Sequence, residues 1–416
     1  MHPTYLLVAT TALAITAGCS PSPTASRSTA GTHTASSRDS ALEARLDRVI
    51  AQAIDEHRIV GAVVIVAHRG TIVYREAHGL ADREARRPMR VDTVHRLASL
   101  TKPLVGVAVL RLAEQGRLEL DAPVTRWLPE FRPKLADGTR PTITLRQLLS
   151  HTAGLGYRFG EPPDGPYHRL GVSDGLDASG ITLDDNLGRL AAAPLLAAPG
   201  TAWNYSLSYD VLGRVIEKVT RQDLETALRA LVTGPLAMAD TSFLAAHPER
   251  LATPYADGAS EPVRMTGLHQ QPFGASTVDF SPSRATDKTA YYSGGGGMVG
   301  TADDYIRFLE ALRAGGAPLV SSSTAAQLGE NAIGELQTFR GPGWGFGLIG
   351  AVLVDPAAAG EPGNAGSFDW GGAYGHSWWV DPSAEISVVA LTNTAFEGMN
   401  GRFPRDLKAA VYEALR

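Results

Sequence analysis

Cysteine is almost absent from this chain, which has Cys19 and no other cysteine among its 416 residues. A single cysteine cannot form an internal disulfide bond, and it cannot build a metal site of several thiolates. The sequence also lacks an HExxH motif and a paired-carboxylate metal motif, and its histidines are scattered. We therefore expect no metal and no other cofactor.

An excess of positive charge is missing too. The net charge is −5 and the sequence pI is near 6.1. Such a chain offers no basic face to a phosphate backbone, so nucleic acid is not expected as a partner. The hydrophobic content of 44% is ordinary for a globular protein and predicts a sizeable core.

The N-terminal apolar run is too short to cross a bilayer comfortably. It covers residues 5–18, YLLVATTALAITAG, which is a typical length for a secretory signal peptide. The run ends in TAGC at 16–19, which resembles a bacterial lipobox although Thr16 stands where leucine is usual. We predict a signal peptide over 1–19, a lipidated Cys19 and a position in the cell envelope, on the periplasmic side of a bacterial membrane. An ordinary secretory signal is the alternative.

Residues 20–40 are rich in Ser, Thr, Pro and Ala and have nothing to bury, so they predict a disordered linker. The folded domain is expected over 41–416. Apolar residues at helical spacing predict a first helix from Ala41 to near His57. The β-rich runs in 61–79 are separated by Arg69-Gly70 and predict a hairpin.

Strand patterns return near the other end of the chain. They occupy 344–355, 371–382 and 384–393, and a helix is expected from about Arg402. The long middle, about 98–290, is rich in helical patterns and loops. This order predicts an α+β fold, with one antiparallel sheet built from both chain ends, flanked by helices, and a helical subdomain beside it.

A serine and a lysine begin the apolar helical pattern at 95–116, HRLASLTKPLVGVAVLRLAEQG. Pro103 is tolerated in the first turn of a helix and places the helix start close to Ser99. The spacing of three puts Ser99 and Lys102 on one face, and the helix N-terminus favours a developing oxyanion. Taken alone, however, the pattern is better explained by a serine N-cap beside a solvated lysine.

Four further blocks follow this motif in order. They are PTITLRQLLSHTAGLGY (141–157), PGTAWNYSLSYDVLGRVIE (199–217), SGGGGMVGTADDYIRF (293–308) and DWGGAYGHSWWVDP (369–382). Together with the Ser99-Lys102 block they resemble the class C β-lactamase and penicillin-binding-protein superfamily. They are most similar to its esterase branch, the family VIII carboxylesterases of the esterase B type. The resemblance extends from about residue 45 to 416.

The resemblance implies a catalytic set of Ser99, Lys102 and Tyr205. Ser99 would attack an ester carbonyl and form an acyl-enzyme. Lys102 and Tyr205 are both candidates for accepting the serine proton, and the sequence leaves the choice between them open. The backbone N–H groups of Ser99 and Ala373 would form the oxyanion hole.

Two positions depart from the β-lactamase pattern. Leu207 replaces an asparagine that contacts the substrate amide, and Trp370 replaces a lysine that helps to bind the substrate carboxylate. The loss of both anchors favours neutral esters. We expect both residues to contact substrate, together with Gly371, Gly372 and the pocket-lining Tyr157.

Other motifs are interpreted as structural. His151 and His376 are expected to be structural histidines, although His376 could contact substrate. Ser173 lies in a G-x-S-x-G sequence, but no strand precedes it and no helix follows, so we expect a loop residue without a catalytic role. The glycine-rich 293–300 lacks the Lys-Ser or Lys-Thr of a phosphate loop and predicts close backbone packing near the site.

The sequence therefore predicts a monomeric serine carboxylesterase for small neutral esters. A β-lactamase or D-amino-acid peptidase is one alternative, which Leu207 and Trp370 disfavour. An acyltransferase to small alcohols is another, because the same acyl-enzyme would serve both reactions. An inactive penicillin-recognising envelope protein is the least favoured, because Ser99, Lys102 and Tyr205 are all present.

Overall fold

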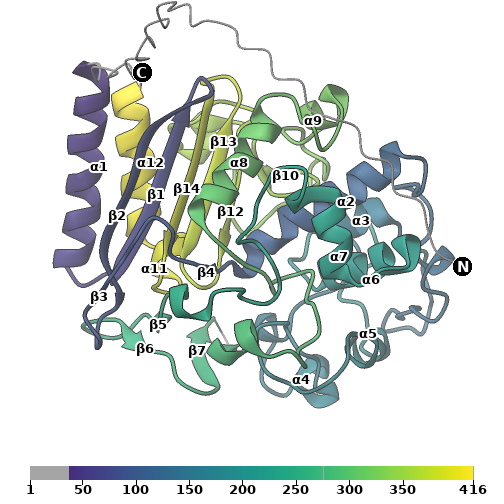
Figure 1. Ribbon diagram of the computed structural model, residues 1–416. Coiled ribbons are helices and arrows are strands. Elements are labelled where there is room, and N and C mark those ends of the chain that lie inside the picture. Colours follow the sequence, from purple (N-terminus) through teal and green to yellow (C-terminus); the bar gives the residue numbers. More distant parts are fainter. Residues whose placement is uncertain (1–36, 275, 416) are drawn as a thin grey trace, which may run out of the picture. The chain divides into compact units, whose positions relative to one another are not determined.

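An eight-stranded antiparallel sheet joins the two ends of the described chain, which covers residues 37–274 and 276–415 of a computed structural model (Figure 1). Its strands are β1 (Gly61–His68), β2 (Thr71–Asp82), β3 (Arg87–Pro88), β10 (Trp344–Phe346), β11 (Ala351–Leu353), β12 (Phe368–Gly372), β13 (His376–Asp381) and β14 (Ile386–Thr392). The spatial order is β10-β11-β12-β13-β14-β1-β2-β3. Ala62 of β1 lies opposite Thr392 of β14, so the first and last strands are neighbours. The predicted α+β fold is confirmed.

The central strands are apolar along nearly their whole length because both faces of the sheet are covered. In β1, Val63 and Ile65 belong to the main core on one face. Val64 and Val66 belong to a second core on the other face. Side chains of a strand alternate between the two faces, so a run such as GAVVIVAH fills both cores at once.

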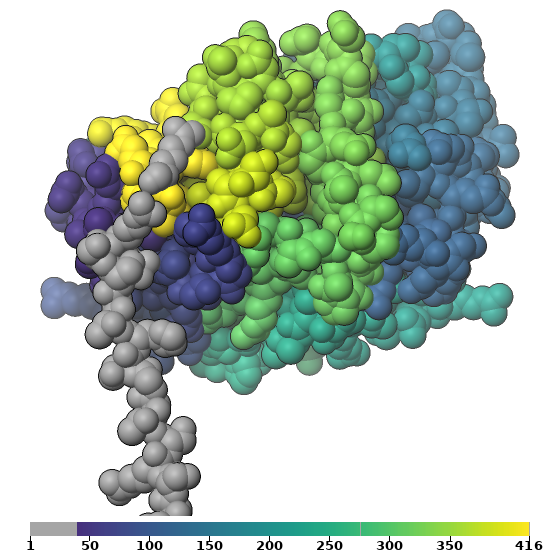
Figure 2. Space-filling view, turned by 90° about the horizontal axis from the view of Figure 1, so that it is seen from above, coloured from purple at the N-terminus to yellow at the C-terminus, as the bar shows by residue number. Residues whose placement is uncertain are grey.

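Helices α1 (Ser37–Asp55) and α12 (Arg402–Leu415) cover the second core and pack against each other (Figure 1). In Figure 2 the purple first helix and the yellow C-terminal residues lie side by side on the surface. Each helix turns an apolar stripe inward. The buried residues of these stripes are Leu42, Leu46, Ile50 and Ala53 in α1, and Phe403, Leu407, Ala410 and Val411 in α12.

Helix α1 begins at Ser37, so the prediction that residues up to 40 form the linker is wrong for the last four of them. The apolar pattern reveals a helix only from its first buried residue, Leu42, whereas the turn before it is polar. The expected signal peptide over 1–19, with Cys19, and the rest of the expected linker lie outside the described residues.

The other face of the sheet carries α8 (Ala302–Arg313), which packs on β1, β13 and β14. Helix α2 (Thr101–Glu114) packs on α6 (Ser208–Thr220) and is buried at nearly every position. The remaining helices are α3 (Leu145–Leu149), α4 (Pro166–Leu170), α5 (Leu183–Ala192), α7 (Leu224–Leu228), α9 (Ser322–Gln327), α10 (Pro356–Ala359) and α11 (Glu397–Asn400).

The middle of the chain is less purely helical than expected. It contributes three small two-stranded sheets, which pair β4 with β9, β5 with β6 and β7 with β8. These strands are β4 (His95–Arg96), β5 (Tyr255–Ala256), β6 (Val263–Arg264), β7 (His269–Phe273), β8 (Ser276–Phe280) and β9 (Val299–Gly300). Short helical turns are η1 (Ala98–Leu100), η2 (Val124–Arg126), η3 (Arg158–Gly160), η4 (Arg229–Thr233), η5 (Pro248–Arg250) and η6 (Pro282–Thr286).

Two expected strands are interrupted by glycine turns. Residues 344–355 form β10 and β11, because the N–H of Gly347 donates to the carbonyl of Gly350 and closes a turn. Residues 371–382 contain the end of β12, a turn and β13, and Gly375 in that turn has a φ of 105°. His376 therefore lies on β13, and Trp370 lies on the preceding strand, β12.

Within the described residues, no helix has the length and apolar character needed to cross a membrane. In the same part of the chain, no group of three or more His, Cys, Asp or Glu side chains could hold a metal ion.

Candidate active site

Ser99 lies on a sharp turn at the edge of the main core. It belongs to η1, directly before α2, so the start of the regular helix falls two residues later than the position of Ser99. Ala98 has a φ of 45°, which is uncommon for a residue with a side chain. Ala98 and Leu100 are buried while Ser99 is partly exposed, so the turn presents the serine hydroxyl at the surface of the core.

Lys102 is the second residue of α2 and is only 2% exposed. Its Nζ lies 3.2 Å from Ser99 Oγ and donates to the carbonyl oxygen of Gly295 at 2.6 Å. It also lies 4.7 Å from the ring centroid of Tyr205 and 5.3 Å from that of Tyr157. Two oxygens and two aromatic rings thus surround the buried side-chain nitrogen of Lys102 beside the serine.

Tyr205 approaches Ser99 from the segment before α6. Its hydroxyl is hydrogen-bonded to Ser99 Oγ at 2.7 Å. The indole Nε1 of Trp370, on β12, donates to the same phenol oxygen at 3.2 Å. The structure therefore brings together Ser99, Lys102, Tyr205 and Trp370, which the sequence had placed in three separate blocks.

His151 packs against the ring of Tyr205 and helps to fix its position. The ring centroids of His151 and Tyr205 are 4.7 Å apart, and Nδ1 of His151 lies 3.0 Å from Ser206 Oγ. The N–H of Asn204 donates to the carbonyl of His151. Burial, helped by the positive charge of Lys102, holds the pKa of His151 well below its usual value, so the imidazole is neutral.

The backbone around Ala373 faces the serine turn. Ala373 is the first residue after β12, and within the described residues its N–H and that of Ser99 donate no hydrogen bond. Gly372 permits this approach, since a β-carbon there would lie 2.6 Å from the carbonyl oxygen of Leu97. Two free amides beside one hydroxyl are the donors that a tetrahedral oxyanion requires.

The expected substrate contacts divide into two groups. Trp370 and Tyr157 form aromatic walls, with ring centroids 5.1 Å and 5.2 Å from that of Tyr205. Gly371 is partly exposed, whereas Gly372 is buried against the carbonyl of Leu97. Leu207, in contrast, is 0% exposed and belongs to the main core, so its side chain is not open to a substrate. It is the N-cap residue of α6, where an apolar side chain turns inward.

Trp370 sits in a larger aromatic cluster. Its ring centroid lies 5.2 Å from that of Phe346 and 5.9 Å from that of Phe339. The guanidinium of Arg340 lies 5.2 Å from the indole and forms an ion pair with the buried Asp369 at 2.5 Å. The charge of the nearest arginine is thus already balanced by a carboxylate.

Two further groups near Lys102 have no signal in the sequence motifs. The first is the carbonyl of Gly295, from the glycine-rich segment expected to pack closely near the site. The second is the buried carboxyl of Asp210, which lies 2.5 Å from the place a β-carbon on Gly295 would take. Burial raises the pKa of Asp210 to about 6, against the opposing effect of the Lys102 charge.

Ser173 is a loop residue, but it is buried and its hydroxyl is fully engaged. It donates to Asp177 and accepts from the N–H of Gly175 and from the Tyr291 hydroxyl, both at 3.1 Å. These partners explain the residue without a catalytic role. Its burial was not visible in the polar, proline-rich sequence before it.

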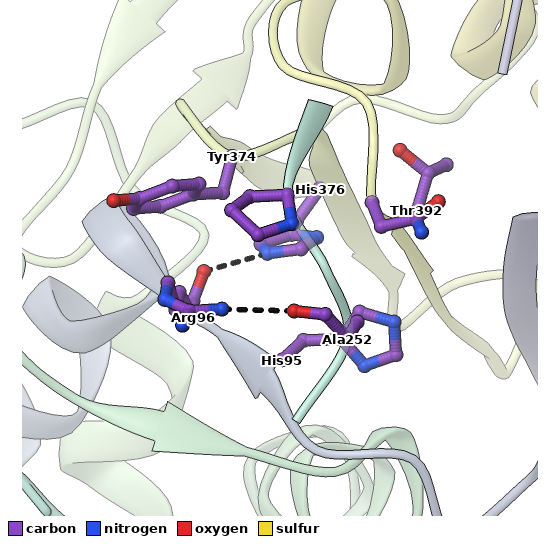
Figure 3. A pocket seen from close by; sticks show the side chains of 8 residues that line it. His95, Arg96, Ala252, Tyr374, His376 and Thr392 are labelled. Carbon is purple, nitrogen blue, oxygen red and sulfur yellow. Dashed lines mark hydrogen bonds between the residues drawn. The ribbon is translucent and has the colours of Figure 1, made fainter. Parts of the chain in front are cut away.

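His376 lines a separate small cavity, drawn in Figure 3 with His95, Arg96, Ala252, Tyr374 and Thr392. The cavity has a volume of about 10 Å³, close to the minimum for one water molecule. His376 Nε2 bonds to the carbonyl oxygen of Arg96 at 2.7 Å. Burial lowers the pKa of His376 to about 4, so the ring is neutral. The geometry fits the structural role expected for it.

A larger hollow of about 300 Å³ lies between α5, α6 and residues 290–292. Its charged lining is already paired, since Arg214 bonds to Asp184 at 2.6 Å and to Glu217 at 2.9 Å. Neither Ser99, Lys102 nor Tyr205 lines it.

Comparison with known proteins gives a consistent result. A family model described as Beta-lactamase matches residues 46–413. Esterase EstB of Burkholderia gladioli is 56% identical over 383 residues, which cover 91% of this chain and 97% of that protein. Monacolin J acid methylbutanoyltransferase of Aspergillus terreus is 27% identical over 411 residues, covering 89% and 94%.

A solved structure is also similar. EstCE1, described as a hydrolase with promiscuous acyltransferase activity, matches with a TM-score of 0.89 and 48% sequence identity, over 91% of this chain and 100% of that chain. The residues 46–413 that the family model matches include every residue of the site described above. The chain therefore belongs to the β-lactamase family and is of its family VIII esterase type.

Proposed function

We propose that this protein is a serine carboxylesterase that hydrolyses small neutral esters through an acyl-enzyme. The observation that carries the proposal is the hydrogen-bonded contact of Ser99 Oγ with both Tyr205 and Lys102. A serine hydroxyl is a weak nucleophile at neutral pH and needs a neighbouring group that accepts its proton. Both neighbours here are within the distance that proton transfer requires.

The first half-reaction forms the acyl-enzyme. Ser99 Oγ attacks the ester carbonyl carbon while its proton passes to the Tyr205–Lys102 pair. The N–H groups of Ser99 and Ala373 stabilise the tetrahedral oxyanion. The bond between the carbonyl carbon and the alcohol oxygen then breaks, and the alcohol leaves with the proton that the pair had taken up.

The second half-reaction restores the serine. Water attacks the acyl carbon, the Tyr205–Lys102 pair takes one water proton, and the carboxylic acid leaves as Ser99 Oγ regains a proton. A neutral substrate fits this site better than an anionic one. Trp370 presents an indole, and the nearby Arg340 is neutralised by Asp369.

The test is a paired assay with a p-nitrophenyl ester and nitrocefin. Purified protein that lacks residues 1–36, and its Ser99→Ala variant, receive p-nitrophenyl acetate, p-nitrophenyl butyrate and, separately, nitrocefin. We expect ester turnover that the substitution abolishes, with little nitrocefin hydrolysis. Fast nitrocefin turnover would instead support a β-lactamase, and ester turnover that survives in Ser99→Ala would refute the assignment of the nucleophile.

Acyl transfer to alcohols is the second candidate function. It is favoured by the acyltransferase activity described for EstCE1 and by the similarity to the methylbutanoyltransferase, and it needs the same acyl-enzyme. Product analysis separates the two functions. A predominance of new ester over free acid, when an alcohol is supplied in water, would favour the transferase.

We also propose that the protein is an exported, monomeric enzyme tethered to the cell envelope through a lipidated Cys19. The support is the sequence of residues 5–19, which combines an apolar run with TAGC. The full chain and its Cys19→Ser variant, expressed in a bacterium, test the anchor by fractionation. The proposal expects activity in the membrane fraction for the full chain only, and light scattering of the released domain tests the monomer.

A further inference from the structure

An exposed aromatic side chain stands beside the candidate active site. Phe339 is 71% exposed, the largest fraction among the large exposed apolar side chains of the described residues. Its ring centroid lies 5.3 Å from that of Trp203 and 5.9 Å from that of Trp370. Isolated apolar residues are common on surfaces. This one continues the wall of the site outward and adds apolar area at its mouth.

The chain on both sides of Phe339 is anchored. Thr338 is buried, and its hydroxyl accepts a hydrogen bond from the N–H of Arg340 at 3.2 Å. Arg340 is itself held by its ion pair with Asp369 and by its position over the Trp370 ring. The phenyl ring is therefore held at the rim by an ordered backbone. A ligand that packs on it loses little binding free energy to ordering of the loop.

The phenol oxygen of Tyr205 indicates which half of an ester reaches this ring. In the proposed mechanism the leaving alcohol takes its proton from the Tyr205–Lys102 pair. Lys102 is only 2% exposed whereas Tyr205 is partly exposed, so the alcohol oxygen must come within hydrogen-bond distance of the phenol. The other groups bonded to the phenol oxygen are Ser99 Oγ and the indole N–H of Trp370. The substituent on the alcohol oxygen thus begins beside Trp370, and Phe339 is the next ring outward.

A different row of rings leaves Tyr205 in another direction. Tyr157 contacts the ring of Tyr205, and the row continues to Phe159 and Phe273 with centroid distances of 4.6 Å and 5.6 Å. No ring contact within the described part of the chain joins Phe339 to this row. Two separate aromatic walls can therefore receive the two halves of an ester.

We infer that Trp370 and Phe339 form the alcohol subsite of this enzyme and that Phe339 determines its specificity for esters of aromatic or bulky apolar alcohols. The inference rests on the proposed esterase function and adds the class of substrate. The same subsite would receive an acceptor alcohol whenever an alcohol, rather than water, attacks the acyl-enzyme.

The test compares two ester series at a pH-stat. One series varies the alcohol on a fixed acetyl group, with ethyl acetate and benzyl acetate. The other varies the acyl group on fixed ethanol, with ethyl acetate and ethyl phenylacetate. The proteins are the wild type, Phe339→Ala, Phe339→Tyr and the control Ile72→Ala, an exposed apolar residue that is 44% exposed on β2.

The subsite predicts that Phe339→Ala lowers the benzyl-to-ethyl ratio of kcat/KM for the acetates by about tenfold, the size of effect that an apolar contact gives. Phe339→Tyr and Ile72→Ala keep that ratio within about twofold, and Phe339→Ala keeps the acyl-series ratio. An unchanged benzyl preference in Phe339→Ala, or an equal change in the acyl series, would overturn the inference. A wild type that cleaves no ester, or a Ser99→Ala variant that remains active, would instead refute the proposed function itself.

Discussion

The hydroxyl of Ser99 has two polar neighbours that differ in chemistry. The Tyr205 hydroxyl lies 2.7 Å from Ser99 Oγ, and Lys102 Nζ lies 3.2 Å from it and also bonds to a main-chain carbonyl. The shorter contact and the additional hydrogen bond from Trp370 favour Tyr205 as the group that exchanges a proton with Ser99. In this role Tyr205 accepts the serine proton as a phenolate and becomes a phenol, and the positive charge of Lys102 stabilises the phenolate before the transfer.

Replacing Tyr205 with phenylalanine tests this division of roles. The variant keeps the ring contacts with Trp370, Tyr157 and His151 but loses the hydroxyl. We expect kcat to fall by about 10² to 10⁴, the contribution of a positioned acid–base group, with little change in Tm.

Tyr74→Phe is the matched control, because it also removes one tyrosine hydroxyl, which here bonds to Asp47 of α1. It should leave the rate of ester hydrolysis close to that of the wild type. A Tyr205→Phe variant with wild-type kcat would show that Lys102 alone accepts the proton.

For Ser173 we predict the reverse of Tyr205, a loss of stability without a loss of activity. Its hydroxyl links Asp177, Gly175 and Tyr291 in the interior. Ser173→Ala removes one hydrogen-bond partner from each of these groups and should lower the free energy of unfolding by about 1–3 kcal/mol. Ester hydrolysis by the folded variant should be retained. A well-folded but inactive Ser173→Ala protein, judged by circular dichroism and a p-nitrophenyl acetate assay, would contradict the assignment of Ser99.

The catalytic residues could be predicted from sequence because each lies in a recognisable block. The groups that hold them could not. The ring of His151 contacts the ring of Tyr205. Lys102 donates a hydrogen bond to the carbonyl oxygen of Gly295, and the carboxyl of Asp210 lies close to the same glycine. Carbonyls and ring contacts carry no residue pattern of their own, and they depend on how distant segments pack. For the same reason Leu207, aligned with a substrate contact, is in fact a core residue.

At the scale of elements, the approach of β12 to the η1 turn sets the geometry of the site. Gly372 is the last residue of β12, and a methyl group there would lie 2.6 Å from Leu97 O and 2.9 Å from Leu100 Cδ1. A backbone carbonyl cannot move aside without shifting Ser99, which is two residues from Leu97. The separation between the Ser99 and Ala373 amides therefore depends on this glycine.

Gly372→Ala should reduce kcat for p-nitrophenyl acetate at least about 10²-fold, because the second amide of the oxyanion hole moves away. It should also lower Tm. Gly188→Ala is the control, since it lies in α5 with no atom within 4 Å of the added carbon. Alanine is the better helix former, so that variant should be as stable as the wild type or more stable. Full activity in Gly372→Ala would refute this account of the turn.

Element boundaries were predicted less well than element types. Periodicity cannot separate β10 from β11, because both are apolar and the Gly347–Gly350 turn contains Leu348 and Ile349, which are buried as well. The turn after β12 was missed for a similar reason, since Tyr374 within it is buried. A short turn inside the core has the composition of a strand.

For the whole molecule, the predicted sheet was confirmed because both chain ends carry strand patterns of the doubly buried type. Strand β1 pairs with β14 on one edge and with β2 on the other, and β14 pairs with β13 on its second edge. The small sheets of the middle segment were not predicted. Strands of two to five residues, such as β5 and β7, are too short to show a period.

Buried carboxyls make the stability of the whole fold depend on pH. Asp174 accepts hydrogen bonds from the N–H groups of Arg158 and Phe159, and burial raises its pKa to about 7. The unfolded chain loses this proton near pH 4, whereas the folded chain keeps it to about pH 7. The contribution of Asp174 to stability is therefore fully present below about pH 4 and is lost as the pH rises to 7.

Urea unfolding of the wild type and Asp174→Asn at pH 5 and pH 8 measures this effect. Between these values the free energy of unfolding of the wild type should fall by about 2–3 kcal/mol more than that of the variant. Burial lowers the pKa of His376 to about 4, so this histidine makes the free energy of unfolding rise with pH. Both proteins contain it, and the comparison between them therefore removes its contribution. Parallel pH profiles would show that Asp174 is ionised in the folded protein.

The most direct test of the central claim is to trap the acyl-enzyme. The purified protein is mixed with p-nitrophenyl acetate, quenched in acid during the first turnover, digested and analysed by mass spectrometry. We predict one acetyl group on the peptide that contains Ser99, in an amount that matches the burst of p-nitrophenol, and none in Ser99→Ala. An acetyl group on another residue, such as Ser173, or turnover with no acylated peptide, would contradict the account.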